Sequence, residues 1–565
     1  MTVRSSQFAV RFSRLTFLTI FAPLMNRPLL SYLAIGVFTL TLYGCSISTT
    51  SREWKIHWDK ERLAEKEKFL EEKKQEEGNR AHSSRPNVIL IMADDLGKYD
   101  VSTYGATHIQ TPNIDRIAAE GVLFENAYVT APICSPSRAA ILTGKYPQRY
   151  GFESQPMEYY PSNIVEYSAG KNAGFLGDWK VATLPNYPNE WEIAKQGIPL
   201  PEITLAELMK AAGYRTAIMG KWHLGAGKTQ TPNKRGFDEQ YGFYGAFSLY
   251  TPSQKTPGYQ HFIQEDFSAR YQWNMKRLST AAIRKNNRVV RENDYLTFAI
   301  RDEAIRFLEA NRDTSFFLYI PFNAPHVPFQ APQEYCDRFA HVQDPNKQVY
   351  YAMIAAMDDA IGEILDKVKE LGLEENTIIW FISDNGGASY TGATDNGPLK
   401  GGKLTYFEGG INVPFAMKWK GHIPEGTTYQ PAVSALDIFA TTIGQCGIGL
   451  QEGNLIDGVD LIPYIAGNAA GLPHEKLFWR ADHIRAVQTG EWKMMMSMRD
   501  KWLHLYNLKS DKSETIDLQY ENQETLKRLQ DYFEEWNSNL PTKPMWPRIM
   551  DRKFVIDGKE YYFPA

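Results

Sequence analysis

Short apolar runs alternate with stretches of helical periodicity over most of the chain, beginning near residue 85. Four of these runs have the composition of buried strands, and they cover residues 88–92, 214–219, 316–320 and 377–382. Between them, residues 113–121 and 349–372 carry apolar side chains at helical spacing, and Thr204 and Glu207 have the spacing of a capping box. The alternation predicts an α/β domain with a large mixed, mostly parallel sheet flanked by helices.

The last hundred residues follow a different pattern, which is typical of an antiparallel sheet. Residues 484–489 and 492–496 flank a Gly490-Glu491 turn and predict a β-hairpin, to which residues 502–508 could add a strand. One amphipathic helix follows, with apolar positions at Leu526, Leu529, Phe533 and Trp536. We therefore expect a large α/β domain over residues 85–465 and a smaller C-terminal α+β domain over residues 466–565.

The N-terminal 50 residues have the features of an export signal. They contain four arginines and no acidic residue, and the apolar run 29–43 is shorter than the roughly 20 residues of a spanning helix. Leu42-Tyr43-Gly44-Cys45 resembles a bacterial lipobox, in which Cys45 would become the lipid-modified first residue of the mature protein. Residues 1–45 are thus expected to be a leader, and Ser46 favours the outer membrane. An uncleaved anchor and a periplasmic location are the alternatives.

Charges of both signs dominate the next segment. Residues 51–80 hold nine basic and nine acidic side chains, which predict a solvated helix or spacer, so we expect residues 46–84 to form a charged linker between membrane and body. The whole chain has a formal charge of −4, so no nucleic-acid partner is expected. Four cysteines in 565 residues exclude a disulfide-stapled scaffold, and we expect Cys336 and Cys446 to be free.

Polar residues follow each of the four predicted strands. They are Asp94-Asp95, Lys221-Trp222-His223, Asn323-Ala324-Pro325-His326 and Asp384-Asn385. Because ligands of open α/β sheets bind at the carboxyl ends of the strands, these groups are expected to form one active site. The oxygen donors Asp94, Asp95, Asp384 and Asn385 carry about three negative charges, which predicts Ca²⁺, with Mg²⁺ as the less favoured ion. The absence of Cys and His from this donor set argues against zinc.

One further motif points to a family. Cys134-Ser135-Pro136-Ser137-Arg138 and the following Leu142-Thr143-Gly144 resemble the signature of the type I, formylglycine-dependent sulfatases of the alkaline-phosphatase-like superfamily. The resemblance extends over about residues 85–520 through Ala93-Asp94-Asp95-Leu96-Gly97, Thr111-Pro112-Asn113-Ile114-Asp115, Gly220-Lys221-Trp222-His223-Leu224-Gly225, Arg235-Gly236-Phe237-Asp238, Ala324-Pro325-His326 and Asn396-Gly397-Pro398-Leu399-Lys400-Gly401-Gly402-Lys403. Two departures, Asn412 in place of Arg and an apparent insertion at 152–196, are expected to bear on substrate choice.

The resemblance implies a reaction and assigns roles to the site residues. A formylglycine-generating enzyme would oxidise Cys134 to Cα-formylglycine (3-oxoalanine), whose hydrate supplies the nucleophile for sulfate-ester hydrolysis and then releases sulfate. Asp384 would take the attacking proton, and Arg138 would hold the hydrate beside the metal, which polarises a sulfate oxygen. The remaining roles are sulfate binding by Lys221 and Lys403, leaving-group protonation by His326 with Lys403, and removal of the second hydrate proton by His223.

The substrate is expected to be a sulfated polysaccharide or its oligosaccharides. The segment 152–196 contains rings that could stack on sugar faces, namely Tyr159, Tyr160, Tyr167, Trp179, Tyr187 and Trp191. Two alternatives remain at this point. One is a phosphonate or phosphate-ester hydrolase of the same superfamily, and the other is an inactive glycan-binding protein that keeps an unmodified Cys134.

Overall fold

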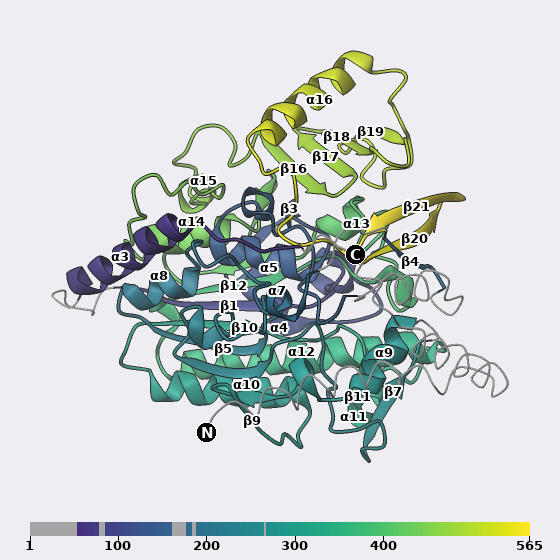
Figure 1. Cartoon of the computed structure of the whole chain (residues 1–565). Helices are drawn as coiled ribbons and strands as arrows, with labels where there is room; N and C mark the ends of the chain where they lie inside the picture. Colours follow the sequence, from purple (N-terminus) through teal and green to yellow (C-terminus); the bar gives the residue numbers. More distant parts are fainter. Residues whose placement is uncertain (1–53, 78–84, 161–176, 183–187, 265–266) are drawn as a thin grey trace, which may run out of the picture.

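A ten-stranded mixed sheet forms the centre of the molecule (Figure 1), with strand order β14-β2-β13-β12-β1-β10-β5-β6-β8-β9. The structure is a computed structural model that describes residues 54–77, 85–160, 177–182, 188–264 and 267–565. The four predicted strands lie side by side in its middle and are all parallel: β12 (Thr377–Ser383), β1 (Asn87–Ala93), β10 (Phe316–Pro321) and β5 (Arg215–Lys221). Their carboxyl ends therefore meet at one edge, and the fold class expected from the sequence is confirmed.

Shorter strands extend this central block on both sides. Parallel to β5 runs β6 (Glu239–Phe243), followed by the antiparallel β8 (Arg284–Lys285) and β9 (Arg288–Val289). On the other side lie β13 (Phe415–Lys418), antiparallel to β12, and then β2 (Val122–Phe124) and β14 (Thr427–Tyr429). The sheet is thus mixed, because its antiparallel pairs lie toward the edges.

Helices cover both faces of the sheet and divide the core into two layers. Ile89 and Ile91 of β1 pack with α4 (Pro112–Ala119), α10 (Leu296–Ala310) and α12 (Pro345–Glu370). Val88, Leu90 and Met92 face the opposite layer, which contains α5 (Cys134–Thr143), α8 (Leu205–Ala211) and α14 (Asp437–Gln445). This division follows from the two-residue period of a strand buried on both faces. The capping box predicted at Thr204 and Glu207 is present at the start of α8.

The remaining described helices and strands of the α/β part are short. They are α7 (Glu190–Ile193), α9 (Phe267–Met275), α11 (Gln333–Arg338), α13 (Glu408–Ile411), α15 (Ile462–Ile465), β3 (Ala127–Tyr128), β7 (Tyr259–Phe262), β11 (Phe329–Pro332) and β15 (Val433–Ser434). Within them, β7 pairs with β11 and β3 with β15.

The C-terminal region forms a four-stranded antiparallel meander with a helix on it. Its strands are β16 (Lys476–Ala481), β17 (Ile484–Thr489), β18 (Trp492–Ser497) and β19 (Leu503–Asn507), and the helix is α16 (Gln523–Ser538). The predicted hairpin and amphipathic helix are therefore confirmed, with Leu526, Leu529 and Phe533 buried.

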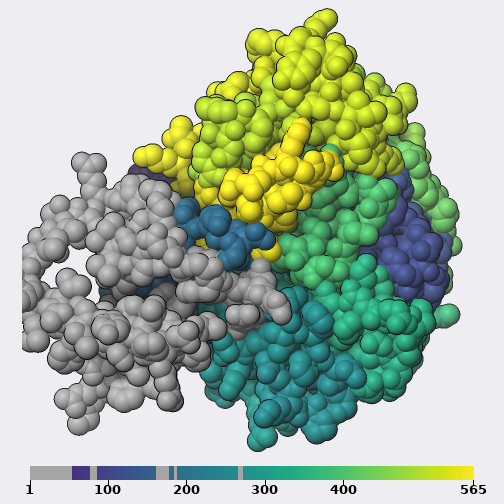
Figure 2. Space-filling model, turned by 90° about the vertical axis from the view of Figure 1, so that its right-hand side faces the viewer, coloured from purple at the N-terminus to yellow at the C-terminus, as the bar shows by residue number. Residues whose placement is uncertain are grey.

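The end of the chain returns to the α/β part of the molecule. The hairpin β20 (Met550–Ile556) and β21 (Lys559–Pro564) pairs with β4 (Trp179–Val181), which lies in the inserted segment. Figure 2 shows the region of β4 in blue against the yellow C-terminal hairpin. The sequence did not predict this three-stranded sheet, because it joins strands that are far apart along the chain.

Part of the charged linker is docked on the body. Helix α3 (Lys60–Glu77) has the predicted helical conformation and exposes most of its described side chains, but it is docked on the body and is not a free spacer. Lys66 is 4% exposed, and its Nζ lies 2.7 Å from Glu207 Oε2 and donates to the carbonyls of Leu200 and Glu202. These partners compensate the cost of burying the ammonium. Within the described ranges, no helix combines the length and apolar character needed to cross a membrane. The lipobox-like residues and Cys45 lie outside those ranges.

Candidate active site

The ten predicted site residues come together at the carboxyl edge of the four central strands. None of them is more than 4% exposed: Asp94, Asp95, Cys134, Arg138, Lys221, His223, His326, Asp384, Asn385 and Lys403. Asp94 and Asp384 follow β1 and β12 directly, Lys221 is the last residue of β5, and His326 lies in the loop after β10. Cys134 and Arg138 come from α5, one helical turn apart, so both face the strand ends.

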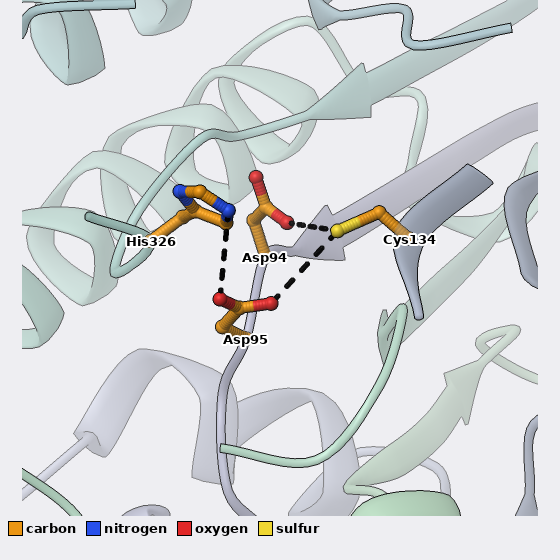
Figure 3. A group of neighbouring side chains, drawn as sticks. All are labelled: Asp94, Asp95, Cys134 and His326. Carbon is orange, nitrogen blue, oxygen red and sulfur yellow. Dashed lines mark hydrogen bonds and ion pairs between the residues drawn. The ribbon is translucent and has the colours of Figure 1, made fainter. Parts of the chain in front are cut away.

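Two consecutive carboxylates converge on Cys134 (Figure 3). The Cys134 Sγ lies 3.5 Å from Asp94 Oδ1 and 3.9 Å from Asp95 Oδ1. Neighbouring side chains of an extended strand point to opposite faces, but Asp95 has a φ of 64° in the left-handed region. This conformation breaks the alternation after β1 and brings both aspartates to the same point. A non-glycine residue held in this region indicates that the surrounding structure enforces the turn.

Three buried cations neutralise the three buried carboxylates. Lys221 Nζ contacts both oxygens of Asp94 at 2.9 and 2.7 Å, and Lys403 Nζ lies 2.8 Å from both oxygens of Asp95. Arg138 Nε donates to Asp384 Oδ2 at 2.7 Å, and its Nη2 lies 3.4 Å from Asp94 Oδ1. Burial alone would raise the pKa of Asp94 and of Asp95. The ammonium of Lys221 beside Asp94, and that of Lys403 beside Asp95, instead bring each pKa below its ordinary value.

The titratable groups around this cluster are held in defined states. Burial, together with the charge of Lys403, lowers the pKa of His326 to about 4, and burial lowers the pKa of His223 well below its ordinary value. Both imidazoles are therefore neutral near pH 7. Burial raises the pKa of the Cys134 thiol far above its ordinary value, so an unmodified Cys134 is protonated. Since thiolates and not thiols are nucleophilic, this site is not built for cysteine chemistry.

Two of the four predicted oxygen ligands, Asp94 and Asp95, belong to a group that could hold a metal ion, together with Cys134 and His326, which were not predicted as ligands. Carboxylate oxygens of Asp94 and Asp95, the Cys134 Sγ and a ring nitrogen of His326 all lie within 4.8 Å of one another. Asp384 adjoins this group, since its Oδ1 accepts the backbone N–H of Asp95 at 3.2 Å. Asn385 donates its amide N–H to Asp95 Oδ1 at 2.8 Å, while among the described residues its buried Oδ1 has no hydrogen-bond partner. A buried unpaired amide oxygen beside three carboxylates is suited to coordinate Ca²⁺ or Mg²⁺.

One neighbour of the site, Tyr250, was not singled out by the sequence. Tyr250 donates its hydroxyl to the backbone carbonyls of Asn323 and His326, the latter at 2.8 Å, and so fixes the loop that carries His326. No motif surrounds Tyr250 that could have identified it. Asn323 is 2% exposed and lies beside Asp94, whose N–H bonds to the carbonyl of Ala324 at 3.0 Å. Neither amide atom of Asn323 has a partner among the described residues.

Asn412, expected to bear on substrate choice, has a different environment. It is buried, its Oδ1 accepts from Lys98 Nζ at 3.3 Å, and its Nδ2 donates to Glu408 Oε2 at 3.1 Å. The hydrogen bonds described for it reach none of the ten site residues. Asn412 therefore links Lys98 to Glu408, the first residue of α13.

The described aromatic residues of segment 152–196 do not form one exposed surface. Tyr160 is buried and donates its hydroxyl to the carbonyl of Pro547 at 2.7 Å, and the ring of Trp179 lies 4.9 Å from the Arg552 guanidinium. Tyr159 is partly exposed, and Trp191 is 81% exposed. Tyr167 and Tyr187 lie outside the described residues. As expected, Cys336 and Cys446 are both free thiols.

Comparisons with known proteins agree with this geometry. The family model described as Sulfatase matches residues 86–448. The chain is 33% identical to N-acetylgalactosamine-6-sulfatase of Rattus norvegicus over 414 residues, which cover 72% of this chain and 71% of that protein. It is 31% identical to Homo sapiens steryl-sulfatase over 456 residues, 70% of this chain and 72% of that protein. The crystal structure of Ps i-CgsB in complex with k-i-k-neocarrahexaose is similar, with a TM-score of 0.68, 31% identity, and coverage of 82% of this chain and 95% of the other.

Proposed function

Because the chain belongs to the sulfatase family and is a sulfuric ester hydrolase, we propose that it desulfates a sulfated polysaccharide or its oligosaccharides. The observation that carries the proposal is the set of buried cations and acids around Cys134 at one edge of the sheet. The choice of a carbohydrate substrate is supported by relatives named for an amino sugar sulfate or solved with k-i-k-neocarrahexaose. Both similarities exceed 30% identity.

Cys134 is proposed to act after oxidation to Cα-formylglycine by a maturation enzyme. When formed and hydrated, that residue supplies one hydroxyl to attack sulfur and a second whose deprotonation expels sulfate. The motif Cys134-Ser135-Pro136-Ser137-Arg138 and the match to the sulfatase family support the modification. The position of Cys134 as the first residue of α5 also places any negative charge at a helix N-terminus, where it is stabilised.

Asp94, Asp95, Asp384 and Asn385 are proposed to hold a divalent cation, Ca²⁺ rather than Mg²⁺. A bound ion of this kind would orient the nucleophilic hydroxyl and polarise a sulfate oxygen. Arg138 is fully buried and its Nε donates to Asp384 Oδ2, so it fixes the position of this carboxylate. Asp384 is then placed to accept the proton of the attacking hydroxyl.

Lys221 and Lys403 are proposed to bind the sulfate oxygens as negative charge develops. Both reach the site fully buried, which strengthens their interaction with an anion. Burial alone would lower the pKa of Lys403, but Asp95 raises it well above its ordinary value, so this lysine is a charged donor. Its neighbour His326 keeps Nδ1 against the carbonyl of Val327, which fixes the ring with Nε2 toward Asp95. The charged Lys403 would donate the proton to the leaving oxygen, and His326 would share this role only when Nε2, which faces Asp95, carries a second proton. The neutral His223 would accept the proton that triggers sulfate release.

We also propose that the protein is exported and anchored by a lipid on Cys45 to a bacterial membrane, and most specifically to the outer membrane. The sequence motif around Cys45 supports this location.

Sulfate release from a panel of sulfated glycans tests the function directly. The protein is produced in a host with a formylglycine-generating enzyme, and ion chromatography measures released sulfate from each glycan and from nitrophenyl sulfate. We expect release from at least one glycan and a strong preference for nitrophenyl sulfate over nitrophenyl phosphate. Preference for the phosphate would favour a phosphate-ester hydrolase. Binding of sulfated glycans without any release would favour the inactive glycan-binding protein.

A further inference from the structure

A buried ionic cluster lies between the C-terminal sheet and the loop that carries Lys403. Lys493 on β18 places its Nζ 2.8 Å from Glu408 Oε1 and 2.9 Å from Glu514 Oε1. The three side chains are no more than 3% exposed. Residues 400–409, which we call the Lys403 loop, end at the start of α13, whose first residue is Glu408. Lys493 and Glu514 belong to the C-terminal region. We call these three residues the Lys493 triad.

The C-terminal region holds this loop at both of its ends. At the far end, the backbone N–H of Glu408 donates to Glu514 Oε2 at 2.7 Å. At the near end, Lys400 Nζ contacts the carbonyl of Glu514 and lies 2.6 Å from Asp557 Oδ2, in the turn between β20 and β21. The loop is closed on itself by the N–H of Gly409, which donates to the carbonyl of Lys400 at 2.8 Å. Residues 400–409 are therefore a closed loop with its base held by the C-terminal region.

The other side of the same loop reaches the active site. The N–H of Lys403 donates to the carbonyl of Gly387 at 2.9 Å, and its Nζ lies 2.8 Å from both Asp95 oxygens. The next residue, Leu404, has a φ of 75° although it carries a branched side chain. Such a conformation persists only where surrounding contacts enforce it. The loop therefore depends on its anchors for the conformation that directs Lys403 inward.

We propose that Lys493 is a positioning residue, through which the C-terminal region fixes the Lys403 ammonium at Asp95 for the reaction. The proposal rests on the proposed function, because it assigns an effect on catalysis to Lys403. Buried ion pairs are a weak source of stability compared with apolar residues of the same size, and their best-supported role is to specify one conformation. In the Lys493 triad, the carboxylates of Glu408 and Glu514 lie on different segments and share one ammonium. This arrangement specifies how the two segments are placed relative to each other.

The test compares Lys493→Met with a matched variant, Arg480→Met. Arg480 on β16 also joins the C-terminal sheet to the α/β body, since its Nη2 lies 2.6 Å from Glu153 Oε1 with both side chains buried, but it makes no contact with the Lys403 loop among its described bonds. Both substitutions remove one buried cation of an ion pair. We expect both to lower thermal stability, and only Lys493→Met to reduce kcat, by about tenfold or more with a smaller change in KM.

Two further measurements separate positioning from general destabilisation. In a double-mutant cycle with Lys403→Ala, Lys493→Met should cause no additional loss of kcat, because its effect passes through Lys403, whereas Arg480→Met should act independently. Lys493→Arg should restore most of the activity. If Lys493→Met does not fold, Glu514→Gln, which keeps the shape and the bond from the Glu408 N–H, replaces it in the same cycle.

A wild-type kcat in the folded Lys493 or Glu514 variant would overturn the inference, as would losses that multiply with Lys403→Ala. A wild-type protein that releases no sulfate from any substrate would instead refute the proposed function. The two failures are therefore distinguishable.

Discussion

Asp95→Asn is the substitution that most directly tests the proposed metal site. It keeps the size of the side chain and removes one of three buried carboxylate charges. Lys403, 2.8 Å from both oxygens, loses an attraction of about 6 kcal/mol at an effective dielectric constant of about 20. Measured losses of one partner from a buried pair are about 3–5 kcal/mol, so we take this range for the metal-free protein. The substitution also removes a charged ligand from the cation.

The assay measures thermal unfolding and sulfate release, each with a chelator and with added Ca²⁺. For the wild type, chelation should abolish activity, Ca²⁺ should restore it, and an ion concentration of 100 times Kd should stabilise the fold by about 2.7 kcal/mol. Asp95→Asn should lose most of this Ca²⁺-dependent stabilisation, and its kcat should fall by about 100-fold or more.

A matched control separates the metal from the ion pair. Asp457 is a largely buried carboxylate that receives two bonds from Arg149, at 2.5 and 2.7 Å, outside the site. Asp457→Asn should destabilise the protein but leave the Ca²⁺ response intact. An Asp95→Asn variant with the full Ca²⁺ response and wild-type kcat would refute our assignment of Asp95 as a ligand. Rescue by Mg²⁺ and not by Ca²⁺ would contradict only the identity of the ion.

Three other predictions concern the nucleophile, the anchor and the docked helix. In mass spectrometry, a tryptic peptide spanning Cys134 should show sulfur replaced by oxygen with two hydrogens fewer. Cys134→Ala should keep the fold and Ca²⁺ binding but release no sulfate. An active enzyme with only unmodified cysteine would contradict the proposed nucleophile. Cys45→Ala should move the protein from the membrane to the soluble fraction, and if it stays with the membrane, the uncleaved anchor is the better interpretation. Lys66→Met should weaken the docking of α3 by about 1.5–3 kcal/mol, the value of hydrogen bonds to a charged group. Amide hydrogen exchange should then become faster in α3 and not in α12. Unchanged exchange in α3 would show that Lys66 does not hold the helix.

Local patterns were sufficient to predict which residues lie together at the carboxyl edge of the sheet. Each of the four strand runs ends in its polar residues, and the parallel arrangement makes those ends converge, so Asp94, Lys221, His326 and Asp384 could be grouped before their positions were known. The Cys134 motif carries its chemistry in consecutive residues. These features share one property, namely that the information lies within a few neighbouring positions.

Long-range pairings could not be predicted in the same way. The pairing of β4 with β20 joins Trp179 to Arg552, and the Lys493 triad joins residues 408, 493 and 514. No local periodicity encodes which charged residue will be buried with which. Lys66 shows the same limit, since it lies in a run of mixed charges that is typical of solvent-exposed helices, and only its contact with Glu207 distinguishes it.

The docking of α3 has a consequence for the reach of the enzyme. Trp54 donates its indole N–H to the carbonyl of Met545 at 2.7 Å, and the N–H of Ile56 donates to Glu192 Oε2 at 2.6 Å, so the chain is already attached to the body at residues 54 and 56. If Cys45 carries a lipid, only the stretch between Cys45 and Trp54 separates the lipid from the first residue that the structure shows bonded to the body. At the maximal extension of about 3.3–3.6 Å per residue, this stretch spans about 30 Å, less than the diameter of the enzyme itself. With so short a distance between anchor and enzyme, the active site stays close to the membrane. Its polymer substrate would therefore have to reach the cell surface before it could be desulfated.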